Sequence, residues 1–271
     1  MEHNVTVFFD ESGKIDKHVS LMCGLSLPTD FYTTGKINAL NEKLKTDPNY
    51  KLHFTDLGSN DYKNHEEAVS VISNYYRSVR INIVSFIKIQ HINEEKRRYK
   101  NIVDKMIYSK IPERVLYGLL RDYGSFSDIK ARLYIEDSGL YRDFQLDKNI
   151  KEQLNTHSIY RNSHFWVEKA KLKAKNEEIG IEIVDTILGM VRNIIENRPV
   201  TFKDGFPKDK NLWRKKKFIM NMINKYPNFY QLLVNIKYFE LTGHSSLEQK
   251  NIATYLDLFT SKFELELAAQ K

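Results

Sequence analysis

The chain has 271 residues, a length that allows one large domain or two modest ones. Hydrophobic residues make up 41% and charged residues 28%, which excludes disordered, collagen-like and low-complexity proteins. The single cysteine, Cys23, excludes an internal disulfide, and no stretch reaches the roughly 18 apolar residues of a membrane span. We therefore expect a cytoplasmic protein with no membrane partner. The net charge of +7 favours polyanions such as nucleic acid.

The first thirty residues alternate as a β-hairpin does. Val5, Val7 and Phe9 fall on one face of a first strand. A turn through residues 12–14 leads to a second strand, which ends at Pro28. Helical and strand periodicity then follow one another. The predicted elements are a helix over 29–44, a candidate strand over 51–55, a helix over 61–79, a strand over 80–89 and a helix over 93–123 that is kinked at Pro112.

Strand and helix patterns continue to alternate as far as about residue 198. They predict a strand over 131–137, a helix over 147–155, a strand over 164–174 and a helix over 177–196. After Arg198-Pro199 the composition changes, and residues 203–217 hold seven Lys or Arg against two Asp. The remainder predicts helices and no clear strand. We predict an α/β (α+β) core over residues 1–198, with a mixed β-sheet flanked by helices, and a helical C-terminal extension over 199–271.

Two pairs of acids each follow a β-rich run. Asp10 and Glu11 end the first strand, and a Ser-Gly pair follows them. Glu136 and Asp137 end the strand over 131–137 and precede the same Ser-Gly pair. Since successive strand residues point to opposite faces, only one acid of each pair can share a face with its counterpart. Either pair alone is also typical of a turn, but the acidic ends converge if the two strands are neighbours.

A third carboxylate lies inside the predicted helix over 177–196. The helical neighbours of Asp185 are Ile181, Val184 and Leu188, which form the apolar stripe of the helix. Asp185 therefore points toward the core and lies too deep to cap the helix N-terminus. Because burial of an unpaired carboxylate costs much free energy, we expect a metal ion or a basic side chain beside it.

Carboxylates from two strand ends and one helix suit a hard divalent cation. Mg²⁺ prefers oxygen ligands, and a pair of such ions can activate a water and stabilise a leaving oxygen. The eight histidines are scattered without a zinc motif, and the sequence has neither a phosphate-binding P-loop nor a G-x-S-x-G elbow. The sequence therefore favours an oxygen-ligated metal site over a zinc site or a serine nucleophile.

Three segments resemble the domain-of-unknown-function family 3800. They are Asp10-Glu11-Ser12-Gly13, the later acidic strand end, and the helix segment 180–189. The resemblance covers about residues 4–195. It implies a ribonuclease H-like fold, carboxylate-bound Mg²⁺ or Mn²⁺ and phosphodiester cleavage, in a microbial defence or mobile-element context. Residues 134–138 also resemble the acidic end of the fourth strand in ribonucleases H, which implies Asp137 in place of Glu136 as the ligand.

The resemblance implies a set of site residues with acidic or imidazole side chains. His53 resembles a histidine that the family often carries before a helix. The acid that ribonuclease H takes from its first helix has no clear counterpart, so Glu11 or Glu182 would substitute for it. The catalytic candidates are Asp10, Glu11, Asp137 and Asp185, of which the three aspartates are the metal ligands, and the secondary candidates are Glu136, Glu182 and His53.

The basic residues have two interpretations. Residues 168–175 alternate strictly, so that one face of the strand carries Lys169, Lys171, Lys173 and Lys175. This face is either a phosphate-binding ridge beside the acids or protection of an edge strand against pairing with another strand. Trp213 and the basic run over 214–217 would combine base stacking with backbone contacts, although a solvated helix face is the more common role of such a run.

We therefore expect a divalent-metal-dependent nuclease whose partner is DNA or RNA. The alternative is a non-catalytic nucleic-acid-binding or assembly subunit, in which the same fold has lost its metals. The aromatic C-terminal helices are expected to form a packing layer, or a surface for a homo-oligomer or a partner protein.

Overall fold

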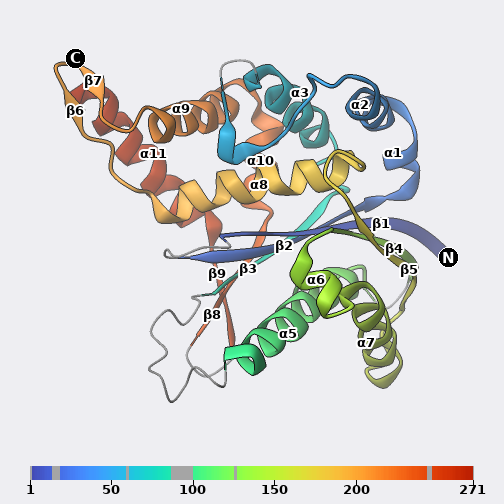
Figure 1. The fold of residues 1–271 in the computed structure, drawn as a ribbon. Helices are drawn as coiled ribbons and strands as arrows, with labels where there is room; N and C mark the ends of the chain where they lie inside the picture. The colour runs from blue at the N-terminus through green and yellow to red at the C-terminus, as the bar shows by residue number, and fades with distance from the viewer. Residues whose placement is uncertain are drawn as a thin grey trace.

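The structure is a computed structural model that describes residues 2–13, 19–58, 61–86, 100–124, 127–242 and 246–270. A mixed seven-stranded sheet lies between two layers of helices (Figure 1), as the α/β prediction required. Across the sheet the strands are β5 (Phe165–Lys173), β4 (Asp128–Glu136), β1 (Glu2–Ser12), β2 (Ser20–Pro28), β3 (Arg80–Phe86), β8 (Lys237–Leu241) and β9 (Leu247–Lys250).

The strand directions bring the carboxyl ends of β1, β4 and β5 to the same end of the sheet. β1 and β2 form the predicted antiparallel hairpin, and β3 is antiparallel to β2. β4 runs parallel to β1, and β5 runs parallel to β4. The register pairs Phe9 with Ile135, so the acids that follow these residues lie side by side. The predicted convergence of the two acidic strand ends is therefore confirmed.

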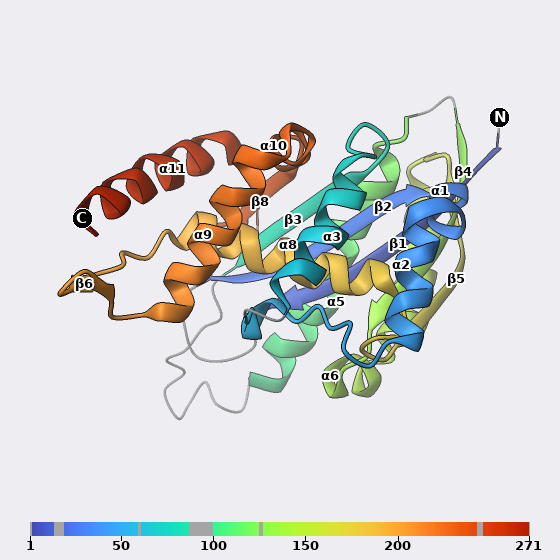
Figure 2. The same ribbon diagram turned by 90° about the horizontal axis from the view of Figure 1, so that it is seen from above.

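One face of the sheet is covered by the larger helical layer, which is seen from above in Figure 2. Helix α8 lies directly on β1 and β2 at the centre of this layer. Its stripe of Ile181, Val184 and Leu188 is buried in a core cluster that also holds Phe8 and Leu21 from the sheet. The helices of this layer are α1 (Thr29–Thr33), α2 (Gly35–Thr46), α3 (Tyr62–Ser73), α8 (Ile179–Glu196), α9 (Lys210–Lys225), α10 (Pro227–Val234) and α11 (Ile252–Ala269).

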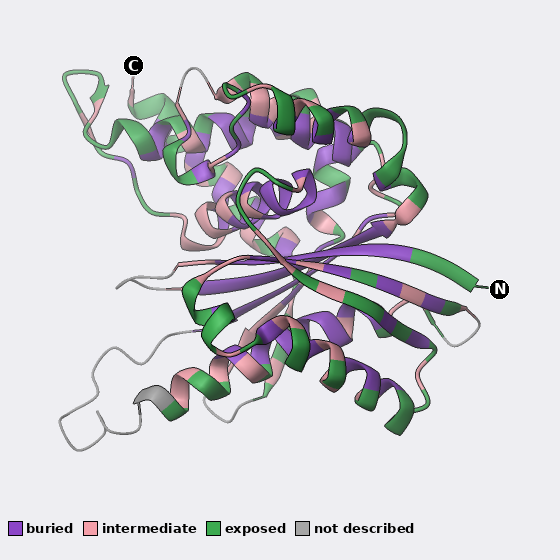
Figure 3. Ribbon diagram, turned by 45° about the vertical axis from the view of Figure 1, so that its right-hand side comes forward, coloured by how far each residue is buried: buried purple, intermediate pink, exposed green. Residues whose placement is uncertain are grey.

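The opposite face packs against α5 (Lys100–Arg121), α6 (Gly139–Asp143) and α7 (Leu146–Tyr160). Val7 and Phe9 belong to this second core cluster, because alternation turns them away from Phe8. The sheet between the two layers is largely buried (Figure 3). No helix in the described residues is both long enough and apolar enough to cross a membrane.

Several predicted elements have different bounds. The single helix over 29–44 is two helices, α1 and α2, separated by Thr34, and Gly35 at the start of α2 has a left-handed φ of +61°. The candidate strand over 51–55 is wrong: the short 3₁₀ helix η1 (Phe54–Asp56) occupies this segment. The helix predicted over 61–79 ends at Ser73. The predicted strand end at 87–89, the helix start at 93–99 and turn residue Lys14 lie outside the described residues.

The prediction of a C-terminal extension without strands is wrong. β8 pairs in parallel with β3, and β9 completes that end of the sheet. A second, two-stranded ribbon joins β6 (Phe202–Lys203) and β7 (Phe206–Pro207). β8 and β9 are short, and β9 is polar, so neither of these two strands shows a clear alternation of hydrophobic and polar residues in the sequence. Residues on both sides of residue 198 share one sheet and one core cluster. The domain boundary at 198 stays a prediction.

Two glycines let α8 approach its neighbours closely. A Cβ at Gly180 would lie 2.4 Å from the ring of Phe8, and a Cβ at Gly189 would lie 2.1 Å from the ring of Phe54. Both distances are far inside van der Waals contact. Any side chain at these positions would therefore push α8 away from β1 or push Phe54 away from α8.

We expect Gly180→Ala to destabilise the protein by about 1–3 kcal/mol, because overpacking against Phe8 outweighs the gain in helix propensity. Gly139→Ala is the matched control, because nothing lies within 4 Å of a Cβ there. Urea unfolding followed by circular dichroism measures both free energies of unfolding. Equal effects of the two substitutions would contradict the close packing of α8 on the sheet.

Candidate functional site

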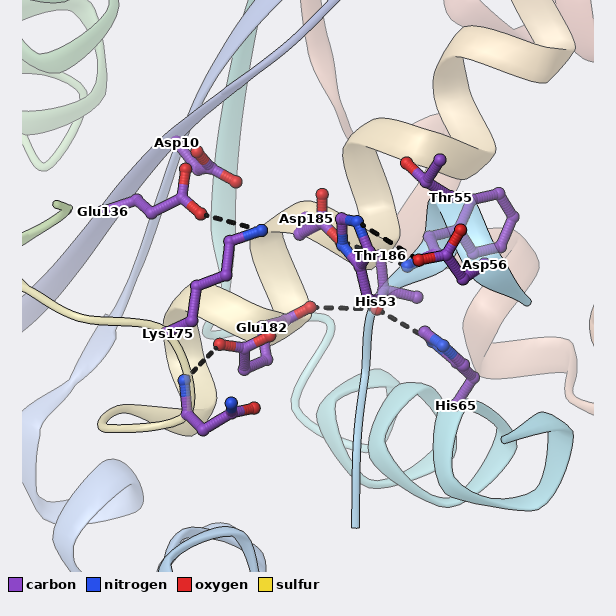
Figure 4. Close-up of polar contacts among 12 residues, drawn as sticks. Asp10, His53, Thr55, Asp56, His65, Glu136, Lys175, Glu182, Asp185 and Thr186 are labelled. Atoms are coloured by element: carbon purple, nitrogen blue, oxygen red, sulfur yellow. Dashed lines mark hydrogen bonds and ion pairs between the residues drawn. The ribbon is translucent and has the colours of Figure 1, made fainter. Parts of the chain in front are cut away.

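Three acids from three separate elements lie near one another at the carboxyl end of the parallel strands. Asp10 comes from β1, Glu136 from the last position of β4 and Asp185 from the middle of α8 (Figure 4). Asp10 and Glu136 are neighbours across the β1–β4 register and are joined by a hydrogen bond between their side chains. The negative charge of Asp185 acts on Asp10 as well.

Asp10 is almost completely buried, with 1% of its surface exposed. Its Oδ1 accepts a hydrogen bond of 2.6 Å from the backbone N–H of Glu11. Burial, the hydrogen bond with Glu136 and the charges of Glu136 and Asp185 together hold the pKa of Asp10 well above its usual value, although the Glu11 N–H lowers it. Asp10 therefore retains its proton at a pH where exposed carboxyls have lost theirs.

Asp185 is held by the segment that leads into η1. Its Oδ2 accepts a hydrogen bond of 3.1 Å from the backbone N–H of Phe54 and lies 3.3 Å from Nδ1 of His53. The hydrogen bond with Asp185 raises the pKa of His53, and this effect exceeds the opposite effect of burial. Asp185 therefore has an imidazole partner, and 22% of its side chain remains exposed to solvent.

Helix α9 holds this segment from its other side. The guanidinium of Arg214 donates to the carbonyl oxygen of Leu57 over 3.1 Å, and Nζ of Lys215 donates to the carbonyl oxygen of Thr55 over 2.8 Å. Together with Gly189, which admits the ring of Phe54 against α8, these contacts fix the position of His53.

Lys175 brings a positive charge into the acids from the turn between β5 and α8. Its Nζ lies 3.5 Å from Oε1 of Glu136. Burial lowers the pKa of Lys175, but the charges of nearby carboxylates outweigh burial and raise it. Those carboxylates are Glu136, Asp185, Glu182 and Asp10. Figure 4 shows the lysine side chain directed toward Glu136.

Glu182 lies one helical turn before Asp185 and is buried. Its Oε1 accepts a hydrogen bond of 2.8 Å from the backbone N–H of Asn176, which closes the turn that carries Lys175. Burial raises the pKa of Glu182 to about 7, and the charges of Asp185 and Glu136 add to this effect. Glu182 is therefore adjacent to the acids and helps to position the turn that holds Lys175.

Two of the acids predicted from the sequence lie elsewhere. Glu11 follows Asp10 on the opposite face of β1, where its carboxylate accepts hydrogen bonds of 2.9 Å from Tyr108 and 2.8 Å from Tyr141. Asp137 follows the end of β4, and its Oδ1 lies 3.4 Å from Nε of Arg142 in α6. The in-register pairing of β1 and β4 brings Glu136, rather than Asp137, beside Asp10, and the role of the three aspartates as metal ligands stays a prediction.

A buried histidine that the sequence did not single out supports the site from behind. Nδ1 of His65 lies 3.0 Å from Oγ1 of Thr186, and Thr186 donates to the carbonyl oxygen of Glu182. Burial lowers the pKa of His65 to about 4. In the sequence, the position of His65 near Ala68 and Val69 in a predicted helix indicates burial. The sequence does not indicate that its partner is Thr186 on α8.

The predicted lysine face is divided. Lys169 and Lys171 are exposed on β5, and Lys173, at the end of this strand, forms ion pairs with Glu177 and Glu178 of 3.6 and 3.1 Å. Lys175 lies beyond the strand and points into the acids. The sequence-based alternation therefore holds for the three lysines of β5 alone.

Comparison with known proteins identifies no relative: no family model, curated protein or solved structure matches this chain. The resemblance to family 3800 stays a prediction. Within the described residues, no group of three or more His, Cys, Asp or Glu side chains is arranged so that it could hold a metal ion.

The raised pKa of Glu182 predicts a pH-dependent stability difference. Between its usual value of 4.5 and about 7, the folded protein keeps a proton that the unfolded chain releases, so stability falls as pH rises through this range. We expect Glu182→Gln to be more stable than the natural protein by about 2–3 kcal/mol at pH 8 and equal to it at pH 4. Urea unfolding at both pH values, in a metal chelator, measures the difference. A difference in the free energy of unfolding that is the same at both pH values would refute the raised pKa of Glu182. Glu152→Gln, at an exposed position of α7, is the control.

Proposed function

We propose that this protein is a divalent-metal-dependent nuclease that hydrolyses phosphodiester bonds, built on a ribonuclease H-like core. The observation that carries the proposal is the convergence of Asp10, Glu136 and Asp185 from two parallel strand ends and one helix. Three neighbouring carboxylates repel one another, and this repulsion lowers the stability of the fold. Their proximity without a structural need therefore favours a functional role for them.

The order of the strands supports the ribonuclease H-like assignment. The fourth strand of the chain lies parallel to the first, and both end in an acid on the same face. This matches the acidic fourth strand that the resemblance to ribonucleases H implies, with Glu136 in the role that the sequence assigned to Asp137.

The donor set fits a hard divalent cation in its chemistry. Asp10, Glu136 and Asp185 offer carboxylate oxygens, which Mg²⁺ and Mn²⁺ prefer, and a cationic group, the ammonium of Lys175, already lies against Glu136. Because these carboxylates are not yet arranged around one point, they would hold the ion only after their side chains move together and Lys175 turns aside, which its position in an exposed turn permits. A bound ion would supply Lewis-acid chemistry, activating a water and stabilising negative charge on phosphate oxygens.

The basic side chains around the acids have roles that follow from their contacts. Lys175 neutralises Glu136 in the free protein and would contact a phosphate oxygen when it turns outward. His53 is oriented by Asp185 through Nδ1, which leaves Nε2 free of Asp185 and 3.8 Å from Oδ2 of Asp56. Its raised pKa favours the protonated ring, which would donate from Nε2 to the leaving oxygen.

A second function, the non-catalytic nucleic-acid-binding subunit, is favoured by the ion pair of Lys175 with Glu136. A lysine can balance crowded carboxylates permanently in a fold that binds no metal. Calorimetric titration with Mn²⁺ separates the two functions, because the nuclease requires binding that Asp10→Asn abolishes.

We expect Asp10→Asn, Glu136→Gln and Asp185→Asn each to lower Mn²⁺-dependent cleavage by at least about 100-fold. Asp137→Asn is the matched control, because its carboxylate faces Arg142, and it should retain activity. Cleavage of labelled single-stranded and double-stranded DNA and RNA, with Mn²⁺ or with chelator, measures the effect. Loss of activity in Asp137→Asn with full activity in Glu136→Gln would overturn the assignment of the site.

A further inference from the structure

The outer face of β5 carries an exposed tryptophan in line with the lysines. Trp166, Lys169, Lys171 and Lys173 lie opposite alternate residues of β4, which are Lys130, Arg132, Tyr134 and Glu136. Trp166 is 47% exposed, and Lys169 and Lys171 are exposed as well. β5 forms one edge of the sheet (Figures 1 and 2), and α7 packs on its other face.

A β-bulge brings these four side chains to one face. The register shifts between Val167 and Lys169, so two residues of β5 take the place of one. Phe165 and Val167 before the bulge, and Ala170 and Leu172 after it, therefore all pack toward α7. Without the shift, the alternation set by Val167 would direct Lys169 and Lys171 to the buried face.

The strip leads to the acids. Alternate strand residues repeat at about 6.6 Å, so Trp166 and Lys173 are about 20 Å apart along β5. Lys173 lies opposite Glu136, which is next to Asp10, and its Nζ lies 5.6 Å from the centre of the Tyr134 ring. The strip and the acids thus share one face and one direction along the sheet.

The charge of the strip is only partly balanced by neighbouring acids. Arg132 pairs with Glu168 at 3.2 Å, and Lys173 pairs with Glu177 and Glu178. Lys169 and Lys171, in contrast, form no ion pair within the described ranges. The close side chain of Lys171, and then its charge, lower the pKa of Lys169, so these two ammonium groups repel one another. A polyanion would relieve this repulsion.

We propose that Trp166, Lys169, Lys171 and Lys173, together called the β5 strip, bind single-stranded nucleic acid and guide its backbone toward Asp10 and Glu136. The binding part of this inference stands on the strip itself, and the guiding part rests on the proposed function. An exposed indole can stack on an unpaired base of any identity, whereas the bases of a duplex already stack on one another. Lysines at regular spacing beside it bind phosphates without sequence preference.

Binding is measured by fluorescence anisotropy with a labelled oligothymidylate of about 12 nucleotides, in a metal chelator, over a salt series. We expect the double variant Lys169→Ala/Lys171→Ala to reduce the slope of log K against log salt by about 1.4, since each phosphate contact of a single strand contributes about 0.7. We expect Trp166→Ala to weaken binding about tenfold with an unchanged slope, because stacking releases no counterions.

Matched controls lie on the other side of the sheet. Lys110→Ala/Lys148→Ala removes the same charge from exposed positions of α5 and α7. Tyr160→Ala removes an aromatic side chain that is 84% exposed at the end of α7. Both controls should bind as the natural protein does. Circular dichroism verifies that every variant is folded.

The outcomes separate this inference from the nuclease proposal. Chelator-resistant binding that depends on the β5 strip, without cleavage in Mn²⁺, supports the strip and refutes the nuclease. The binding site on β5 is overturned if Trp166→Ala and the double lysine variant bind as the natural protein does, or if the controls lose as much affinity. Equal affinity for a duplex of the same length would overturn the preference for single strands.

Discussion

The close packing of α8 on the sheet is the constraint on which the site depends. Gly180 lets the helix approach Phe8 of β1, and Gly189 lets Phe54 approach the helix. The first contact sets the height of Asp185 above the strand ends, and the second brings the backbone N–H of Phe54 within 3.1 Å of its carboxylate. Small residues in a helix thus decide the position of a charged group that neither glycine touches.

The same packing concentrates negative charge where water is largely excluded. Asp10 and Glu182 respond by raised pKa values, whereas Asp185 keeps His53 and Glu136 keeps Lys175 as partners. Burial of like charges opposes folding, and each basic partner offsets part of that cost. A bound cation would stabilise the negative charge that remains in this arrangement. For this reason we propose the metal-dependent function.

A buried ion pair joins the C-terminal helices to each other far from the acids. Nζ of Lys216, fully buried in α9, contacts both carboxylate oxygens of Glu266 in α11 at 2.8 and 2.7 Å, and Glu266 also accepts from the backbone N–H of Val200. The residues of the basic run over 214–217 therefore have different roles, because they lie on different sides of α9. Lys216 is structural, whereas Arg214 and Lys215 hold the segment beside His53.

The sequence by itself determined the elements whose patterns are local: the β1–β2 hairpin, the alternating strands and the apolar stripe of α8 with Asp185 in it. It also determined that one acid of each pair would face the other, since alternation is a property of any strand. Tertiary structure decided which acid. The register that pairs Phe9 with Ile135 selects Glu136, and alternation along β1 turns Glu11 to the tyrosines on the opposite face. Tertiary structure also decided the bulge after Val167 and the pairing of β8 with β3. Register and strand pairing depend on residues that are distant in sequence, so local periodicity does not predict them.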